Sequence, residues 1–469
     1  MLELILVLEK CLYLKDFFMQ KHNKQIFLVC LTASLAGLLF GLDIAFVNGS
    51  LQYIAQEFHI SQVNSQQVAG YLLFGAALGA ILSAPISNIY GRKKVLVLAG
   101  LIFTICTLTG MLSNTLMMLL ISRFFIGISV GIASFITPLY LSEMAPYKLR
   151  GGLGALYQLM ITLGIVLMFI SNYELNFTHS WRIMMSILIL PSVLMLVGCL
   201  RLPESPRWLI LNNREKEARK ILNTIRCDQQ EVDFEVNEIN SSLKNHKNSF
   251  GLLKEPFFLK IILLGVLLQV LQQFTGMNAF MYYSGEIFRS AGFDNPALTT
   301  VIVGIVNVLT TVIAVLFVDK FGRKPILYFG LTLLAISCLV VGYLFSLSVL
   351  NDLNKFTLLI FCLLFIFAFA ISLGPVVWIV CSEIYPLEAR DLGLTFSTAT
   401  NWICNFIIGS YTLTWFNNFG KSNTFWAFGL VSVLGLILVN KFTPETKGVT
   451  LEHLEINLKN NKKLRDLGM

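Results

Sequence analysis

Apolar stretches of about 20 residues follow one another along most of the chain, and short polar connectors separate them. A helix of that length crosses the hydrocarbon core of a bilayer. The stretches do not alternate apolar with polar positions, which excludes the strands of a membrane β-barrel. The pattern predicts an all-α membrane protein with twelve transmembrane helices, at residues 25–49, 68–90, 95–113, 115–140, 152–173, 182–201, 258–288, 297–318, 325–346, 355–381, 391–417 and 423–442.

Composition and charge agree with this pattern and add an orientation. The chain is 56% hydrophobic and only 13% charged, whereas soluble domains carry about 25% charged residues. If both termini are cytoplasmic, 30 of the 35 lysines and arginines lie in cytoplasmic parts, 11 of them in residues 201–260. Lysine and arginine gather on the cytoplasmic side of membrane proteins. We therefore expect cytoplasmic termini, and we attribute the net charge of +8 to topology and not to nucleic-acid binding.

Three short motifs occur twice in the same order, at offsets of 231 to 241 residues. The pairs are GRKK at 91–94 with GRKP at 322–325, SEMAPYKLRG at 142–151 with SEIYPLEARD at 382–391, and PESPRW at 203–208 with PETKG at 444–448. This repeat predicts two six-helix halves, and parallel halves of this kind place a substrate site between them near mid-membrane. The predicted parts are an N-terminal cytoplasmic segment 1–24, halves 25–201 and 257–442, a cytoplasmic linker with short helices 202–256, and a cytoplasmic tail 443–469.

The N-terminal segment has two interpretations that the sequence leaves open. Charges such as Glu9 and Lys15 interrupt its apolar residues, so it lacks the clean apolar core and small-residue cleavage site of a signal peptide. It is either an amphipathic helix at the membrane surface or an extension upstream of a true start at Met19.

Two residues of opposite charge, Asp43 and Arg123, lie inside predicted spans. A charge in hydrocarbon costs several kcal/mol unless it is paired or hydrated. From the rise of a helix, both residues lie about 10 to 13 Å from the outer ends of their spans, so they can meet. Arg123 favours the ionised carboxylate and burial favours the protonated acid. The pair therefore predicts a proton-coupling site, and the alternative is a static ion pair that joins two helices.

Several kinds of site find no support in the sequence. The nine cysteines contain no CxxC pair, and the five histidines all lie outside the predicted spans. The chain has no nucleophile elbow, no phosphate-binding loop and no cluster with metal-ligand spacing. We therefore expect no enzyme activity, no cofactor and no metal.

Eight sequence pieces, in order from about residue 25 to the end, together resemble one family. They are GLDIAFVNG, GRKK, the SEMAP box, PESPRW, QQFTGMNAFMYY, DKFGRKP, GPVVWIVCSEIYP and PETKG. In this combination the chain resembles the sugar porters of the major facilitator superfamily. Two stretches, STATNWICNFIIGSYTLTWFNNFG and PETKGVTLEHLEINLKNNKKLRDLG, are most similar to members that carry galactose or arabinose with protons. The chain departs from the family pattern at Asn88, where an acid is common, and at Asn48, where small apolar residues are usual.

The resemblance implies a twelve-helix major facilitator fold in the bacterial inner membrane. It implies proton-coupled monosaccharide uptake by alternating access, with galactose or a related hexose as the first candidate substrate. A facilitative sugar uniporter and a pentose–proton symporter for arabinose or xylose are the alternatives. The expected partners are the sugar, the proton and the lipid bilayer, with the chain functioning as a monomer.

A sugar site should be built from amides and aromatic rings. Amides donate and accept hydrogen bonds and so match hydroxyls, and an indole covers the apolar C–H face of a sugar. By the resemblance, six residues match sugar-contacting positions: Gln158, Gln272, Gln273, Asn278, Trp378 and Asn401. Asn307 joins this set as a further amide within a span. The alternative is hydrogen bonding between helices, because buried polar side chains in hydrocarbon need partners.

Four aromatic residues are predicted to line or gate the cavity: Phe40, Tyr282, Tyr283 and Trp402. Simple packing is the alternative for these rings. Seven charged residues at cytoplasmic helix ends are predicted to form a conformational latch: Arg92, Glu143, Arg150, Asp319, Arg323, Glu383 and Arg390. In the family such clusters close the inner side when the transporter faces outward. Partly solvated pairs, each worth about 1 kcal/mol or less, suit a bistable latch. The alternative is that these residues only anchor the topology.

Overall fold

The computed structural model describes residues 21–145, 150–226, 228–245, 249–347, 349–386 and 389–449, with scattered residues from 454 to 467. It describes only the backbone of residues 21–27, 150–155, 238, 241–245, 249–250, 316–320 and 391. Residues 1–20, where an amphipathic helix or a late start at Met19 is expected, therefore lie outside the described residues. The side chains of Arg150 and Asp319 also lie outside them.

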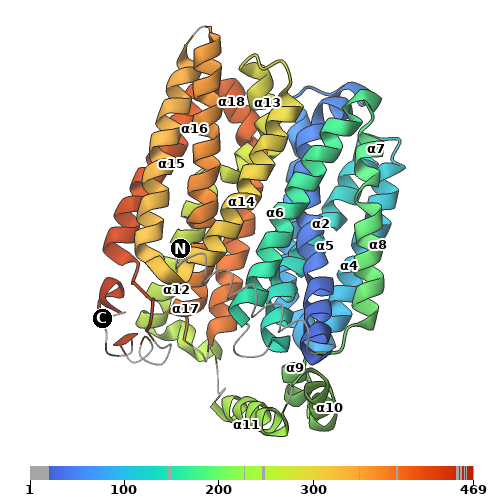
Figure 1. Cartoon of the computed structure of the whole chain (residues 1–469), viewed down its shortest axis with the longest axis vertical. Helices are drawn as coiled ribbons and strands as arrows, with labels where there is room; N and C mark the ends of the chain where they lie inside the picture. Colours follow the sequence, from blue (N-terminus) through green and yellow to red (C-terminus); the bar gives the residue numbers. More distant parts are fainter. Residues whose placement is uncertain are drawn as a thin grey trace.

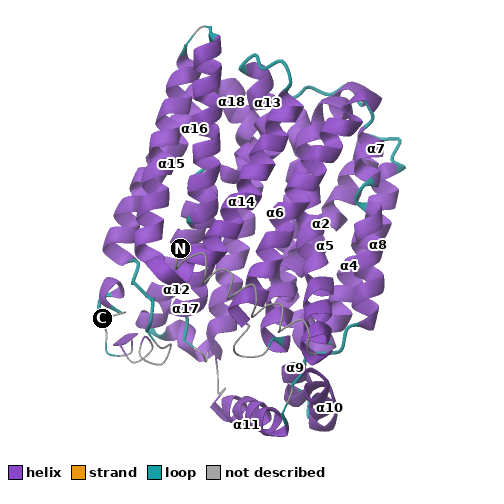
Figure 2. Ribbon diagram, in the orientation of Figure 1, coloured by secondary structure: helices purple, strands orange, loops and turns teal. Residues whose placement is uncertain are grey.

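All regular elements of the described residues are helices (Figure 2). The first half contains α2 (Lys21–Glu57), η1 (Asn64–Gln66), α3 (Gln67–Tyr90), α4 (Arg92–Met111), α5 (Leu116–Met144), α6 (Arg150–Leu175), η3 (Asn176–Thr178), α7 (Trp181–Ser186) and α8 (Ile189–Arg201). The linker contains α9 (Pro206–Leu211), α10 (Glu215–Ile225), α11 (Gln229–Asn245) and η4 (Ser249–Lys254). The second half contains α12 (Pro256–Phe274), α13 (Met277–Ser290), α14 (Pro296–Phe321), α15 (Arg323–Ser346), α16 (Asp352–Ile371), α17 (Leu373–Ile384) and α18 (Arg390–Phe442), and η6 (Leu464–Asp466) follows.

The long helices form two bundles that lie side by side, with α6 and α14 packed together where the bundles meet (Figure 1). Helices α9 to α11 lie beyond one end of the bundles, which we call the linker end; the opposite end is the far end. The linker is fastened to the first half by Arg226, which donates to the Met144 carbonyl at 3.0 Å and pairs with Glu235 at 2.8 Å.

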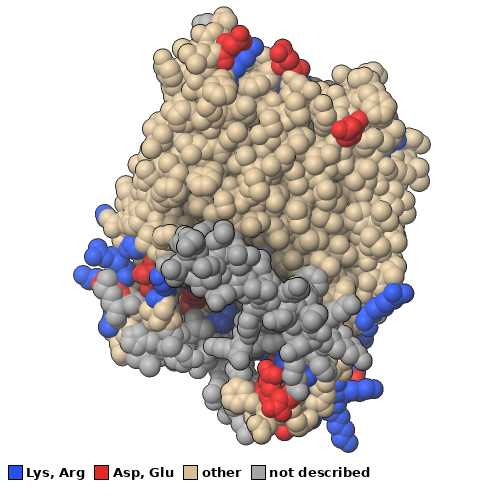
Figure 3. Space-filling model, in the orientation of Figure 1, with Lys and Arg blue, Asp and Glu red and all other residues tan. Residues whose placement is uncertain are grey.

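Eleven helices among the described residues are long and apolar enough to cross a membrane. The remaining expected span, 391–417, forms the first part of α18, which continues through a non-helical Gly420 to Phe442. This first part carries buried polar residues such as Asn401, Asn405 and Thr412, so it is less apolar than the other spans. In Figure 3 the charged side chains on the visible face gather toward the two ends and leave an uncharged middle. The predicted all-helical membrane fold is confirmed.

Close packing between α3 and α5 fixes the level at which Arg123 sits. A Cβ on Gly127 of α5 would lie 1.9 Å from the Leu72 carbonyl oxygen, and one on Gly131 would lie 2.1 Å from that of Ala76. Small residues spaced by four are typical of transmembrane helices whose backbones touch. Because the backbones approach this closely, Arg123 on α5 can reach the backbone of α3.

Candidate functional site

Asp43 of α2 and Arg123 of α5 form a bidentate ion pair in the first half. One guanidinium nitrogen of Arg123 donates to Asp43 Oδ2 at 3.0 Å, and the other contacts Oδ1. Both side chains are at most 1% exposed. The predicted meeting of these two residues is therefore observed.

Two further contacts enclose the guanidinium of Arg123. Its Nε–H donates to the Val68 carbonyl at 3.3 Å, and the ring of Phe46 lies 5.4 Å from its central carbon. A paired carboxylate that accepts two charge-assisted hydrogen bonds is stable as the ion. The ion pair therefore favours the ionised carboxylate, and separation from Arg123 would favour uptake of a proton.

An amide network lies in the second half and joins four of the seven predicted sugar residues. Asn401 of α18 donates to Gln272 Oε1 at 2.6 Å and accepts from Gln273 Nε2 at 3.1 Å. Asn278 donates to Gln273 Oε1 at 2.8 Å. A fifth amide, Gln269, accepts from Asn401 at 2.7 Å.

Two helix breaks bring these amides together. Gly276 separates α12 from α13 with φ 89°, a conformation that favours glycine, and a Cβ there would lie 2.4 Å from the ring of Phe428. The second break, at Ser372, separates α16 from α17. Next to it, Gln272 donates to the carbonyls of Leu373 at 2.8 Å and Gly374 at 3.3 Å. Broken helices at a midplane site are typical of transporters.

The network leaves hydrogen-bonding capacity at three of its members. A primary amide has two N–H donors and an oxygen acceptor. Gln272 and Asn401 each use both donors, on two acceptors apiece. Within the described contacts, Gln269, Gln273 and Asn278 each use one donor; Gln269 is fully buried and Asn278 is half-buried. Gln273 and Asn278 therefore combine a predicted sugar contact with a donor that no described contact uses.

The other three predicted sugar residues lie on different helices. Gln158 is on α6, Asn307 on α14 and Trp378 on α17. Asn307 is buried, whereas Gln158 and Trp378 are half-buried. None of the hydrogen bonds found for the described residues joins them to the amide network, so their role as sugar contacts stays a prediction.

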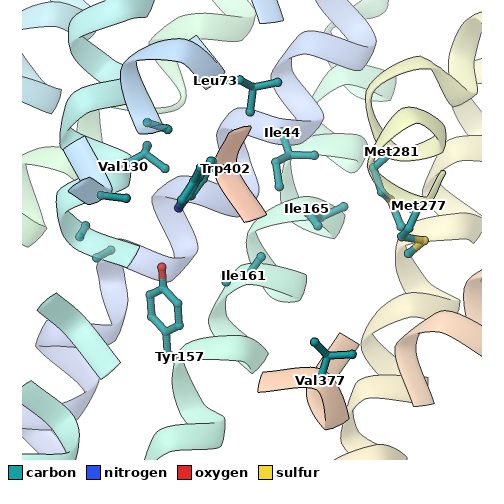
Figure 4. Close-up of a cluster of buried hydrophobic side chains, with 14 of the residues drawn as sticks. Ile44, Leu73, Val130, Tyr157, Ile161, Ile165, Met277, Met281, Val377 and Trp402 are labelled. Carbon is teal, nitrogen blue, oxygen red and sulfur yellow. The ribbon is translucent and has the colours of Figure 1, made fainter. Parts of the chain in front are cut away.

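The predicted gating aromatics fall into two groups. Phe40 and Trp402 join the halves, with ring centroids 5.2 Å apart and the Trp402 indole N–H donating to Ser134 Oγ at 3.1 Å. Figure 4 shows Trp402 among apolar side chains of the first half, including Ile44, Ile161 and Ile165. Tyr282 and Tyr283 of α13 reach toward α18 instead. The Tyr282 hydroxyl contacts Asn405 Oδ1 at 3.5 Å, and that of Tyr283 donates to the Gly409 carbonyl.

Four of the seven charged residues predicted as a latch form ion pairs at the linker end, one pair in each half. Arg92 donates to both carboxylate oxygens of Glu143 at 3.0 Å, and Arg323 donates to those of Glu383 at 2.8 and 3.2 Å. Arg390 begins α18. Asn88, which replaces the acid common in the family, accepts from Arg92 at 3.4 Å. The two pairs occupy equivalent positions in the sequence repeat, and each stays within its own half.

Two acids that sequence reasoning missed cap the helices that carry these arginines. Glu204 accepts from the backbone N–H of Arg92 at 2.9 Å, and Glu445 accepts from that of Arg323 at 3.0 Å. Burial alone would raise the pKa of Glu445, but hydrogen bonds from the backbone N–H groups of Arg323, Lys447 and Lys324 hold it below its ordinary value. The echo of PESPRW in PETKG contains both acids and is the signal that could have revealed them.

Gln269 is the third residue that was missed. It is fully buried, and its amide N–H lies 3.7 Å from Cys381 Sγ while its oxygen accepts from Asn401. Its place one helical turn before Gln273 in an apolar span could have marked it. In the part of the chain described here, no cluster of three potential ligands (His, Cys, Asp or Glu) is arranged to hold a metal ion.

Comparisons with known proteins agree on one family. Residues 29–458 match the family model described as "Sugar (and other) transporter". The chain is 43% identical to the galactose-proton symporter of Escherichia coli strain K12, over 96% of this chain and 98% of that protein. It is 40% identical to the arabinose-proton symporter of the same strain, over 94% of this chain and 95% of that one.

Solved structures give the same result. The proton:xylose symporter XylE, bound to 6-bromo-6-deoxy-D-glucose, superposes with a TM-score of 0.80 at 32% identity, covering 93% of this chain and 99% of that chain. The inward open conformation of XylE from E. coli gives a TM-score of 0.78 at 31% identity, covering 92% and 99%. This chain belongs to the sugar transporter family of the major facilitator superfamily and is a multi-pass protein of the bacterial inner membrane.

Proposed function

We propose that the chain is a monosaccharide–proton symporter that works by alternating access. The observation that carries the proposal is the sealed Asp43–Arg123 ion pair, a titratable carboxylate held inside a transmembrane bundle. An intramembrane ion pair of this kind marks proton relays and ion pathways in transporters. The names of the similar galactose and arabinose proton symporters support the same activity.

The two sites divide the work between the halves. Asp43 in the first half takes up a proton when the pair opens, and the amides of the second half bind the sugar. Protonation removes the attraction to Arg123, so the first half is released from the conformation that the ion pair stabilises. In the cycle, sugar and proton bind from one side and leave on the other, because closure of one end accompanies opening of the other.

The orientation of the molecule and its oligomeric state are part of the proposal. The linker end faces the cytoplasm, because most lysines and arginines lie in the connectors and termini assigned to that side. The far end faces the periplasm, from which sugar and proton enter. A single chain carries both sites, so the monomer is the functional unit.

Galactose is the first proposed substrate, and glucose is expected to compete with it. The experiment is uptake of radiolabelled galactose in a strain without its own sugar transporters, challenged with unlabelled sugars. Strong competition by galactose and glucose, with weak competition by disaccharides, is the expected result. Stronger competition by arabinose or xylose would assign the pentose alternative. Maltose or lactose competing better than any monosaccharide would contradict the proposed site.

The charged pairs at the linker end are proposed to stabilise the closed form of that end. Glu383 accepts from the guanidinium of Arg323 and from the Thr446 hydroxyl, so Glu383→Ala removes both of these contacts at the linker end. We expect a folded variant whose linker end opens more often, seen as faster labelling of an engineered cysteine from the cytoplasmic side. Glu217→Ala, which removes an exposed acid from the pair with Arg214, is the control. If labelling is unchanged and transport is normal, Glu383 does not stabilise the closed linker end, and the alternative, that it only anchors the topology, holds.

A further inference from the structure

Three amide side chains of the first half reach the second half at the far end. Asn48 of α2 donates to the Met281 carbonyl at 2.9 Å and to Ser284 Oγ at 2.8 Å, both on α13. Gln66 donates to Thr414 Oγ1 at 2.6 Å and accepts from the Thr414 backbone N–H at 3.3 Å. Gln62 donates to Glu286, which also pairs with Arg289. We call these contacts the far-end seam.

Asn48 is the seam residue that lies nearest to Asp43 in the sequence. Both of its N–H groups are used on the opposite half, and one of the acceptors is a backbone carbonyl that α13 offers in a fixed position. Its oxygen is seated against Gly285, where a Cβ would lie only 2.9 Å away. The Gln62–Glu286 contact is exposed, and exposed pairs contribute little in water.

Helix α2 is fixed to its own half at the same level. Asn172 of α6 donates to the Ala45 carbonyl at 2.7 Å, and a Cβ on Gly49 would lie 2.4 Å from the Asn172 side chain. A Cβ on Gly41 would lie 1.9 Å from the Ile161 carbonyl. Because α2 and α6 are packed this tightly, the bonds from Asn48 join one half to the other.

We propose that Asn48 is the clasp that holds the far end closed, by tying α2 to α13. The inference rests on the proposed alternating access, in which the two halves separate at this end to admit sugar. Asn48 stands five residues after Asp43 on α2, about 7 Å along the helix. Breaking the clasp therefore removes a tie between the second half and the helix that carries the proton site.

A small recess beside the clasp supplies a reporter position. It is lined by residues of both halves, including Asn48, Gln52, Tyr283, Glu286 and Leu413. Leu413 is only 6% exposed. A cysteine at this position should react slowly while the far end is closed and faster when the halves separate.

The test is maleimide labelling of purified Leu413→Cys in detergent, corrected for labelling of the protein without this reporter. Adding Asn48→Ala should raise the labelling rate about tenfold, the shift expected from two ordinary hydrogen bonds. Ser284→Ala, which removes one acceptor, should give a smaller increase. Gln52→Ala, one turn further along α2 and lining the same recess, should leave the rate unchanged.

Equal rates for Asn48→Ala and Gln52→Ala would overturn the proposal. If Asn48→Ala does not give a monodisperse protein, Ser284→Ala becomes the test. An unchanged labelling rate in Ser284→Ala would then overturn the proposal. The measurement needs neither sugar nor a proton gradient. If Asn48→Ala raises the labelling rate but the protein does not transport sugar, the inference about Asn48 stands while the proposed function fails. The two failures are therefore distinguishable.

Discussion

Replacing Asp43 by asparagine is expected to abolish uphill sugar accumulation while leaving sugar exchange intact. The amide cannot take up or release a proton, so the variant cannot use the proton gradient. It resembles the protonated carboxyl in shape and neutrality, and Arg123 keeps its contacts with Val68 and Phe46. The amide network lies in the other half and is unchanged, so binding and exchange of sugar should persist.

The measurement is a pair of assays in cells or vesicles, accumulation against a gradient and exchange of preloaded sugar. Glu57→Gln is a matched control, because Glu57 is an acid on the same helix that pairs with an arginine, Arg182, but is exposed to solvent. The control should accumulate sugar normally. If the Asp43→Asn variant still concentrates sugar, Asp43 has no role in proton coupling. Its role would then be the static ion pair that joins two helices. Loss of exchange as well would indicate a folding defect and require a thermal stability measurement.

Replacing Gln273 or Asn278 by alanine is expected to weaken sugar binding by about 1 to 3 kcal/mol, or about 5- to 150-fold in affinity. Both side chains have a donor left over in the network, so each is expected to lose a hydrogen bond to a sugar hydroxyl. Trp378→Ala should lose at least as much, because the indole is expected to cover an apolar face of the sugar.

Binding affinity, measured by calorimetry or by displacement of labelled galactose, separates this effect from coupling. The control is Asn423→Ala, an exposed amide of the same half that donates to the Phe419 carbonyl of its own helix. The control should bind sugar as the wild type does. Wild-type affinity in both Gln273→Ala and Asn278→Ala would mean that the amide network only holds helices together.

The helices and the polar residues inside them could be predicted because each depends on local sequence. Apolar stretches of sufficient length must be helical in a membrane, since every backbone polar group has to be satisfied within the segment. Charges and amides inside such stretches are conspicuous for the same reason. This is why Asp43, Arg123, Gln273 and Asn401 were found. The contact between Asp43 and Arg123, predicted from their depth, is observed in the structure.

The contacts that were missed depend on segments far apart in the chain. Nothing local to Asn48 indicates that its acceptors are on α13, more than 230 residues later. Glu204 and Glu445 cap helices whose first residues lie 112 and 122 positions earlier. Pro375 accounts for the break at Ser372, but nothing local indicates that the carbonyls beside the break are offered to Gln272, about 100 positions earlier. Such contacts follow from how the halves pack.

Sugar-driven proton movement is the most direct test of the proton-coupled account. Galactose is added to lightly buffered, de-energised cells that contain the protein, and the pH of the medium is recorded. Symport predicts a rise in external pH when sugar enters, abolished by an uncoupler and absent in Asp43→Asn. Entry of labelled galactose with no change in external pH, unaffected by the uncoupler, would contradict the account and make the protein a uniporter.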